Sequence, residues 1–205
     1  MKHYHFPFSS NSRKVAMTVA HLNIPVETVI VDLSKLEQRK PDYLALNPNA
    51  KVPTLVDGDL VLWESNAIMA YLADKTEGGN AIYPKDLRAR ADVNRWLFWG
   101  ANHWGPAIAI LNWENVVKKM VGAGDPDPAQ VQRGETLVKE NAKVLDEHLA
   151  KRTWLSGDGL TIADFAIAAP LMYTRVAKIP VEGFANLQAW LARVQELDVW
   201  KKTAG

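Results

Sequence analysis

Hydrophobic and polar residues alternate at the start of the chain and then recur at helical spacing. Lys2 to Phe6 alternates as a strand does, whereas Ser12 to Leu22 repeats its apolar residues as an amphipathic helix does. Val26 to Val31 is again typical of a strand. Two strands and a helix within about thirty residues predict a parallel pair of strands joined by a right-handed crossover.

The next segment predicts a hairpin followed by a helix. A short helix is expected around Lys35 to Leu44, and strands are expected at Thr54 to Val56 and Leu60 to Trp63. Asp57-Gly58-Asp59 lies between these strands and is a turn signal. The apolar spacing from Glu64 to Asp74 predicts the helix that completes this α/β unit.

A stretch rich in glycine and polar residues, from Thr76 to Pro84, interrupts the periodic pattern. Beyond it the apolar spacing is helical almost throughout. We therefore expect an α/β domain over residues 1–76, a linker over residues 77–85 and an all-helical domain over residues 86–205.

The second domain begins with a long periodic segment, Asp86 to Val121, in which a kink or a break is expected because Gly105-Pro106 removes a backbone donor. The apolar run Phe165 to Tyr173 is long enough to be a buried central helix. The remaining helices are expected at Ala129 to Leu149 and Phe184 to Leu197.

Composition and charge narrow the possible functions. The 205 residues include 24 basic and 23 acidic side chains, a formal net charge of +1, without a basic run of the kind that binds nucleic acid. The absence of cysteine excludes disulfides and a protein thiol nucleophile, so sulfur chemistry would need a borrowed thiol. The histidines show no metal-ligand spacing, so no metal is expected. No apolar run approaches the length of a membrane span, so a cytoplasmic location without membrane contact is expected.

Val52-Pro53 and Glu64-Ser65 together predict a binding site for a small peptide-like ligand. A proline that enters a strand must lie where no ladder donor is needed, and a cis bond there could turn the Val52 amide and carbonyl outward. Glu64-Ser65 opens a helix whose free amides attract a carboxylate. Each feature alone also has a structural explanation, as a trans proline or as an ordinary helix cap.

Four motifs, in this order, resemble those of the cytosolic glutathione transferase superfamily. They are Phe6 to Val15, with its serines, Asn47 to Leu55, with Val52-Pro53, Glu64 to Ile68, and Thr161-Ile-Ala-Asp164. The resemblance covers nearly the whole chain. It implies an N-terminal thioredoxin-like domain, βαβ-ββα with a mixed sheet, that binds glutathione, and an all-α C-terminal helical bundle that binds a second substrate.

The resemblance also implies roles for individual residues. The backbone of Val52 resembles the group that pairs with the cysteinyl unit of glutathione, and Pro53 resembles the cis-proline after it. Glu64 and Ser65 resemble the pair that holds the γ-glutamyl group, and Lys51 resembles a contact to the glycyl carboxylate. Thr161 and Asp164 match the capping motif of the family, which is a folding element and not a site.

Several residues compete for the role of activating the glutathione sulfur. Ser9 is preferred by spacing, and Asn11 joins it if the chain is similar to the bacterial nu-like group, in which a hydroxyl and an asparagine both contact sulfur. Ser10 remains an alternative, whereas Tyr4 falls inside a strand and is expected to pack in the core. The serines also resemble those of the zeta isomerases, although Arg13-Lys14 departs from that group's usual continuation.

Lowering the pKa of the bound thiol requires a modest amount of energy. A free thiol has a pKa of about 8.5, and lowering it by about two units takes roughly 2.7 kcal/mol. One hydrogen bond to a charged acceptor contributes about 1.5–3 kcal/mol, so Ser9 and Asn11 suffice without an ionised group. Arg13 either adds positive field or is a solvated residue of the first helical turn.

The expected protein is a glutathione transferase in which glutathione is the co-substrate and an electrophile or a disulfide is the second substrate. The alternatives are a nu-like disulfide reductase, a zeta-like isomerase and a non-catalytic binding protein. Candidate contacts to the second substrate lie near the expected helix break, at Asn102, His103 and Trp104. The family resemblance also implies a homodimer.

Overall fold

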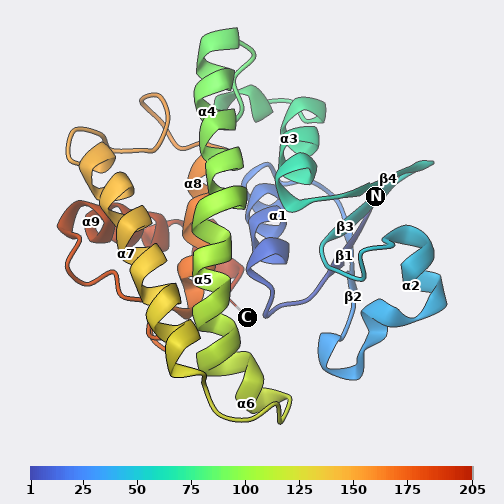
Figure 1. The fold of residues 1–205 in the computed structure, drawn as a ribbon. Helices are drawn as coiled ribbons and strands as arrows, with labels where there is room; N and C mark the ends of the chain where they lie inside the picture. The colour runs from blue at the N-terminus through green and yellow to red at the C-terminus, as the bar shows by residue number, and fades with distance from the viewer. Residues whose placement is uncertain (205) are drawn as a thin grey trace. The chain divides into compact units, whose positions relative to one another are not determined.

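A computed structural model describes residues 1–204 of the chain (Figure 1). The chain divides into two compact units, one formed by Met1–Lys85 with the segment that begins at Leu197, and the other formed by Asp86–Glu196. The expected second domain is corrected in one respect, because the segment from Leu197 belongs to the first unit.

The first unit contains the sheet. Its elements in chain order are β1 (Lys2–His5), α1 (Ser10–His21), β2 (Glu27–Ile30), the 3₁₀ turns η1 (Leu33–Lys35) and η2 (Glu37–Arg39), α2 (Pro41–Leu46), β3 (Thr54–Asp57), β4 (Leu60–Trp63), α3 (Ser65–Lys75), η3 (Gly79–Ala81) and α10 (Asp198–Lys202). The strands lie in the order β2-β1-β3-β4, with β1 parallel to β2 and the other pairs antiparallel. The predicted thioredoxin-like βαβ-ββα order with a mixed sheet is therefore confirmed.

Two local features of this unit follow from proline and glycine. Between β3 and β4, Gly58 adopts a φ of 63°, which glycine tolerates without steric cost, so the expected hairpin turn is confirmed. The helix expected around Lys35 to Leu44 is instead two 3₁₀ turns followed by α2. Pro41 is the first residue of α2, where its missing amide hydrogen costs nothing.

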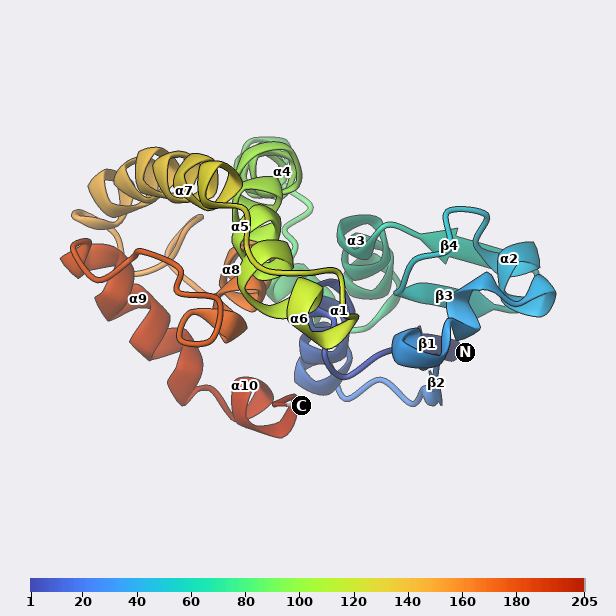
Figure 2. The same ribbon diagram turned by 60° about the horizontal axis from the view of Figure 1, so that its bottom comes forward.

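Helices cover both faces of the sheet. Figure 2 shows α1 and α3 on one side of the strands and α2 on the other. Fully buried side chains of α1, β3 and α3 form the main core, including Met17, Leu55 and Leu72. A second cluster, on the side of α2, consists of Val31, Tyr43, Val52, Tyr4, Phe6 and Leu33. Tyr4 therefore packs in the core, as predicted from the sequence.

The second unit is helical. Its elements are α4 (Leu87–Trp99), the π-helical η4 (Gly100–Trp104), α5 (Gly105–Asn112), the π-helical η5 (Trp113–Val117), α6 (Lys118–Met120), α7 (Pro128–Leu149), α8 (Ile162–Ala168), the 3₁₀ segment η6 (Ala169–Tyr173) and α9 (Ala185–Glu196). Of the kink or break expected at Gly105-Pro106, the break is wrong, because the backbone remains helical from α4 to α6, with the π-helical η4 at this point (Figure 1). The Gly105 amide donates to the Gly100 carbonyl, and this wider π turn accommodates the proline.

The helix α8 is the centre of the second unit, and all of its residues are buried. The predicted capping box is confirmed, since the Asp164 carboxylate accepts hydrogen bonds from the amide of Thr161 at 2.8 Å and from its hydroxyl at 3.1 Å. The same carboxylate accepts hydrogen bonds from the Leu155 amide at 3.1 Å and the Trp190 indole at 2.9 Å. Asp164 thus joins α8, α9 and the loop before α8.

The C-terminal helix α10 is anchored to α1 by a buried arginine. The Arg13 guanidinium lies 3.8 Å from the centre of the Trp200 ring and donates a 2.8 Å hydrogen bond to the Trp200 carbonyl. The alternative that Arg13 is solvated is wrong, because its side chain is buried in the first unit. Among the helices of residues 1–204, none is long and apolar enough to cross a membrane.

Candidate functional site

Ser9 lies at the N-cap of α1, where a turn after β1 places it. The Ser9 amide donates to the Phe6 carbonyl at 2.9 Å, which closes this turn. The Ser9 hydroxyl oxygen accepts a hydrogen bond from the Ser12 amide at 3.2 Å. Its hydrogen has no acceptor within residues 1–204, so the Ser9 hydroxyl can donate to a ligand.

Asn11 and Ser65, which are 54 positions apart in the sequence, meet where the N-termini of α1 and α3 come together. The Ser65 hydroxyl donates to the Asn11 Oδ1 atom at 3.5 Å. This bond leaves the amide hydrogens of the exposed Asn11 available to a ligand. The first turn of α3 also presents backbone amides that have no helical acceptor. Hydrogen-bond donors from two helices therefore converge at this point.

The loop before β3 presents a backbone pair. The Val52-Pro53 bond is cis, as the resemblance implied. Neither the amide nor the carbonyl of Val52 has a hydrogen-bond partner within residues 1–204. The carbonyl of Lys51 accepts hydrogen bonds from the Tyr43 hydroxyl at 2.6 Å and the Asn47 side-chain amide at 2.8 Å. These two buried side chains hold the loop, and the ammonium of Lys51 is exposed.

Glu64 adopts an unusual backbone conformation between β4 and α3. Its φ is 74° and its ψ is 108°, a region that costs a residue with a side chain about 1–3 kcal/mol. The side chain is exposed, and within residues 1–204 its carboxylate makes no hydrogen bond or ion pair, although its charge attracts Lys14. Strained backbone of this kind is concentrated at ligand-binding positions.

Lys14 of α1 interacts electrostatically with Glu64, the residue before α3, and was not among the residues predicted for the site. It follows Asn11 by three positions and therefore shares a face of α1 with it. Its side chain is only 5% exposed. Burial lowers the pKa of Lys14 to about 8, against the opposing attraction of Glu64. A buried cation thus lies close to the exposed Glu64 carboxylate.

The structure does not bring all the residues predicted for the second substrate to a free surface. Trp104 is fully buried in the second unit, and its indole donates to the Ile167 carbonyl at 2.9 Å, so its prediction as a substrate contact is wrong. Asn102 is exposed, but its side-chain amide donates to the Phe98 carbonyl of its own helix at 2.9 Å. His103 is exposed, and its ring lies 6.3 Å from the Trp99 ring.

Several residues that support the site could not be selected from the sequence. The fully buried Ser12 accepts a hydrogen bond from the Phe6 amide at 3.3 Å and donates its own amide to Ser9. Tyr43 and Asn47 act in the same way on the loop before β3. Their signal in the sequence is weak, because a polar residue on a helix face gives no indication of its partner.

Comparison with known proteins places the chain in a family. Residues 1–74 match the glutathione S-transferase N-terminal domain, and residues 128–193 match the glutathione S-transferase C-terminal domain. Glutathione S-transferase F10 of Arabidopsis thaliana is 32% identical over 206 residues, which cover 97% of this chain and 94% of the relative. This chain therefore belongs to the glutathione S-transferase family.

Solved structures agree with this assignment. Glutathione transferase F7 from Populus trichocarpa is 28% identical, with a TM-score of 0.89 over 99% of this chain and 97% of that one. Glutathione transferase URE2P8 from Phanerochaete chrysosporium, solved with oxidized glutathione, is 26% identical, with a TM-score of 0.86 over 98% of this chain and 92% of that one. These plant and fungal relatives do not establish the nu-like subclass that Ser9 and Asn11 suggested.

Proposed function

We propose that this protein is a glutathione transferase that activates the glutathione thiol for attack on an electrophile. In this reaction the thiolate sulfur forms a bond to an electrophilic carbon, the leaving group departs with its electron pair, and the thiol proton passes to solvent. The observation that carries the proposal is the Ser9 hydroxyl, whose oxygen is held by the Ser12 amide at 3.2 Å while its hydrogen is free to donate.

Three parts of the site would recognise the three parts of glutathione. The unpaired backbone of Val52 matches an extended cysteinyl unit, because two antiparallel backbone hydrogen bonds fix its direction. The carboxylate of Glu64 and the start of α3 at Ser65 match the ammonium and carboxylate of the γ-glutamyl group. The exposed ammonium of Lys51 matches the glycyl carboxylate.

Activation of the sulfur requires donors that favour the anion. A donor to a thiolate contributes about 1.5–3 kcal/mol, so Ser9 alone lowers the thiol pKa by about one to two. The amide of Asn11 adds a second donor, and the N-terminus of α1 adds a partial positive charge. Glutathione in this site would therefore be largely thiolate at neutral pH.

The experiment that tests this function is an ultraviolet titration of the thiolate of glutathione bound to the protein, with the spectrum of the free protein subtracted. We expect a bound pKa well below 8.5, the ordinary value for a thiol. Binding with an unshifted pKa would contradict thiol activation and leave a glutathione-binding protein without catalysis. A lack of binding would contradict the whole proposal.

Reduction of disulfides is a second candidate activity, favoured by the position of Asn11 beside Ser65. Because the chain has no cysteine, one glutathione thiolate would attack the disulfide and a second would resolve the mixed disulfide, with formation of oxidized glutathione. An assay with 2-hydroxyethyl disulfide separates the two activities. We expect Asn11→Ala to lower disulfide turnover more than conjugation of 1-chloro-2,4-dinitrobenzene, and an equal loss would argue against a nu-like enzyme.

Of the residues predicted to contact the second substrate, we retain His103, because its ring is exposed and Asn102 is occupied by its own helix. His103→Ala should raise the KM for the electrophile and leave the KM for glutathione unchanged. Asn141→Ala is a matched control, since its side-chain amide donates to the backbone carbonyl of His103 at 3.3 Å and this bond does not involve the His103 ring. An unchanged electrophile KM in His103→Ala would remove His103 from the site.

A homodimer is proposed from an apolar stripe on α4. Leu87 is 83% exposed and Phe98 is 68% exposed. They are eleven positions apart, which is about three helical turns, so they lie on one face of the helix with the exposed Ala91 between them. We expect light scattering to give the mass of two chains, and Phe98→Glu to shift the protein toward the monomer. A monomeric wild-type protein would contradict the proposal.

A further inference from the structure

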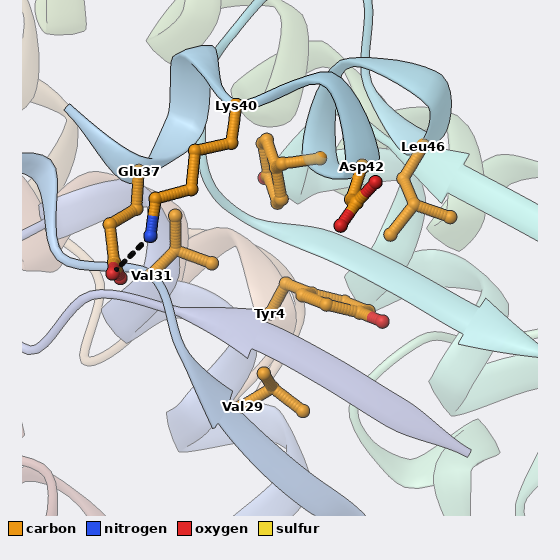
Figure 3. A pocket seen from close by; sticks show the side chains of 8 residues that line it. Tyr4, Val29, Val31, Glu37, Lys40, Asp42 and Leu46 are labelled. Carbon is orange, nitrogen blue, oxygen red and sulfur yellow. Dashed lines mark hydrogen bonds and ion pairs between the residues drawn. The ribbon is translucent and has the colours of Figure 1, made fainter.

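The face of the sheet covered by α2 contains a cavity that is separate from the candidate glutathione site. Its volume is about 210 Å³. The lining side chains come from β1, the end of β2, η2 and α2, as Figure 3 shows, and they are Tyr4, Val29, Val31, Glu37, Lys40, Asp42, Tyr43 and Leu46. Most of the inner surface is apolar, and the charged groups lie at the rim. This combination is typical of sites for small molecules.

Aromatic and aliphatic side chains form the floor of the pocket. Tyr4 and Val29 are direct neighbours across the β1 and β2 pair. The rings of Tyr4 and Tyr43 are 5.9 Å apart and inclined at 62°, so their faces form two sides of a corner. A planar ring placed against Tyr4 would bury apolar area against Val29 and Leu46 as well. The floor therefore selects a planar, uncharged body.

The charges at the rim are not balanced. The Lys40 ammonium is paired with the Glu37 carboxylate at 2.8 Å, so these two charges neutralise one another. Asp42 lies away from the Glu37–Lys40 pair, on the side of the pocket where Leu46 lies, and has no hydrogen bond or ion pair within residues 1–204 (Figure 3). The Tyr4 hydroxyl likewise has no described partner. One carboxylate and one hydroxyl are therefore available to a bound donor.

We propose that this cavity, the α2 pocket, binds small aromatic amines, with the ring against Tyr4 and the ammonium group at Asp42. The unpaired carboxylate disfavours an anionic head group, and the apolar side chains disfavour a polar group in place of the ring. The volume exceeds the roughly 150 Å³ that holds a benzene molecule, so one ring with a short aminoalkyl chain fits. The proposal is independent of glutathione binding.

A ligand bound in the α2 pocket would also affect the loop before β3. Tyr43 lines the pocket and donates from its hydroxyl to the Lys51 carbonyl at 2.6 Å, next to the Val52-Pro53 bond. A ligand that shifts or rigidifies Tyr43 changes the position of this loop. The amine would then change the affinity for glutathione by some factor. Because binding free energies are linked, glutathione would change the affinity for the amine by the same factor.

The test is a titration of the ¹⁵N-labelled full chain with 2-phenylethylamine, followed by amide chemical shifts. We expect saturable shifts confined to residue 4, residues 29–31 and 37–46 and the adjoining loop at residues 51–53, with a Kd on the order of 1 mM for a ligand of this size. The charge-reversed analogue 3-phenylpropionate should bind at least about tenfold more weakly, because each 1.4 kcal/mol of lost attraction is a factor of ten.

Two variants make the assignment specific. Asp42→Asn should bring the two ligands to nearly equal affinity, and Asp59→Asn, which changes an exposed carboxylate of the hairpin turn, should leave the preference intact. Val29→Trp should fill the pocket and abolish the shifts. Shifts centred away from the α2 pocket and the adjoining loop, no saturation, or an undiminished preference in Asp42→Asn would each overturn the proposal. Conjugation activity of Asp42→Asn should equal that of the wild type, since Asp42 is outside the glutathione site.

Discussion

At the scale of single residues, the candidate site depends on what each hydroxyl is already bonded to. Ser9, Ser10 and Ser12 are indistinguishable as residue types, but only Ser9 is the N-cap of α1. Ser10 is the first helical residue, and Ser12 is fully buried with its oxygen bonded to the Phe6 amide at 3.3 Å. The choice of Ser9 as the activating residue therefore gains a physical reason that spacing alone did not provide.

Replacing Ser9 by alanine removes the proposed donor to sulfur. We expect Ser9→Ala to raise the pKa of bound glutathione by about one to two and to lower kcat/KM at pH 6.5 by about 10- to 100-fold, because a charged hydrogen bond of about 1.5–3 kcal/mol is lost. Ser10→Ala is the matched control and should retain the wild-type pH profile. If Ser10→Ala shifts the profile and Ser9→Ala does not, the assignment of the two serines is reversed.

We expect that the buried Lys14 lowers the stability of the fold and strengthens glutathione binding. Its pKa in the folded protein is about 8, below the ordinary 10.5, so the unfolded chain holds the proton more tightly and stability is lost as the pH falls from 10.5 to 8. At pH 7 the buried cation is therefore costly. Lys14→Met should raise the free energy of unfolding at pH 7 by about 1–3 kcal/mol.

The same Lys14→Met change should weaken glutathione binding, because Lys14 lies near Glu64 and its positive charge favours a γ-glutamyl carboxylate. Urea denaturation and calorimetric titration measure the two effects on one protein. Lys139→Met, on the exposed face of α7, controls for the loss of a lysine. Reduced stability together with unchanged glutathione affinity would show that Lys14 has only a structural role.

At the scale of elements, apolar periodicity predicted the helices and strands well wherever one face is buried. β3, β4, α7 and α9 lie within a few residues of their expected positions, and the parallel β1 and β2 pair follows from the short crossover. Periodicity could not predict the π segments η4 and η5, since the extra residue in a turn depends on packing against other elements. Nor could it predict the position of α10, which depends on one arginine that stacks on Trp200.

The residues of the candidate site also divide into those that were predicted from the sequence and those that only the structure reveals. The cis bond at Pro53 was implied by the family resemblance and the start of α3 was predicted from a local motif, whereas the side-chain contacts of Lys14, Tyr43 and Asn47 were not predicted. Trp104 was misassigned because the helix does not break at Pro106 and its side chain stays in the core. Sequence patterns thus locate backbone features of the site better than the side chains that support them.

The capping box of α8 predicts a strong stability effect from one carboxylate. Asp164→Ala would leave the amides of Leu155 and Thr161 and the Trp190 indole without their acceptor in a buried place. We expect a loss of about 3 kcal/mol or more in the free energy of unfolding, measured by urea denaturation. Asp158→Ala, in the exposed loop before α8, should change it by less than about 0.5 kcal/mol.

At the scale of the whole molecule, two histidines of β1 link the stability of the first unit to pH. His3 is 2% exposed, and burial together with the nearby His5 lowers its pKa from 6.5 to about 3. Burial also lowers the pKa of His5, whose ring lies 5.1 Å from that of His3. Both lowered pKa values favour the neutral rings in the folded protein near neutral pH, and among residues 1–204 Nε2 of His3 and Nδ1 of His5 have no hydrogen-bond partner.

The direction of the pH effect follows from where the protons bind. Below pH 6.5 the unfolded chain takes up protons at both histidines, whereas the folded chain excludes a proton from His3 down to about pH 3, so stability falls as the pH falls through this window. Each excluded proton contributes a slope of about 1.4 kcal/mol per pH unit. Urea denaturation between pH 7.5 and 5 should therefore show a steady loss, before most carboxylates titrate.

His3→Phe keeps a ring of similar size and removes one titrating group, so its stability should depend less steeply on pH between 6.5 and 5. His103→Phe is the control, because His103 is exposed, lies in the second unit and is outside the histidine pair. Unfolding of the first unit at mildly acidic pH should abolish glutathione binding, because the candidate glutathione site lies in that unit. The helices of the second unit should persist. Two results together would argue that acid acts through other groups. The circular dichroism signal and glutathione binding would disappear together, and the stability of His3→Phe would depend on pH as steeply as that of the wild type.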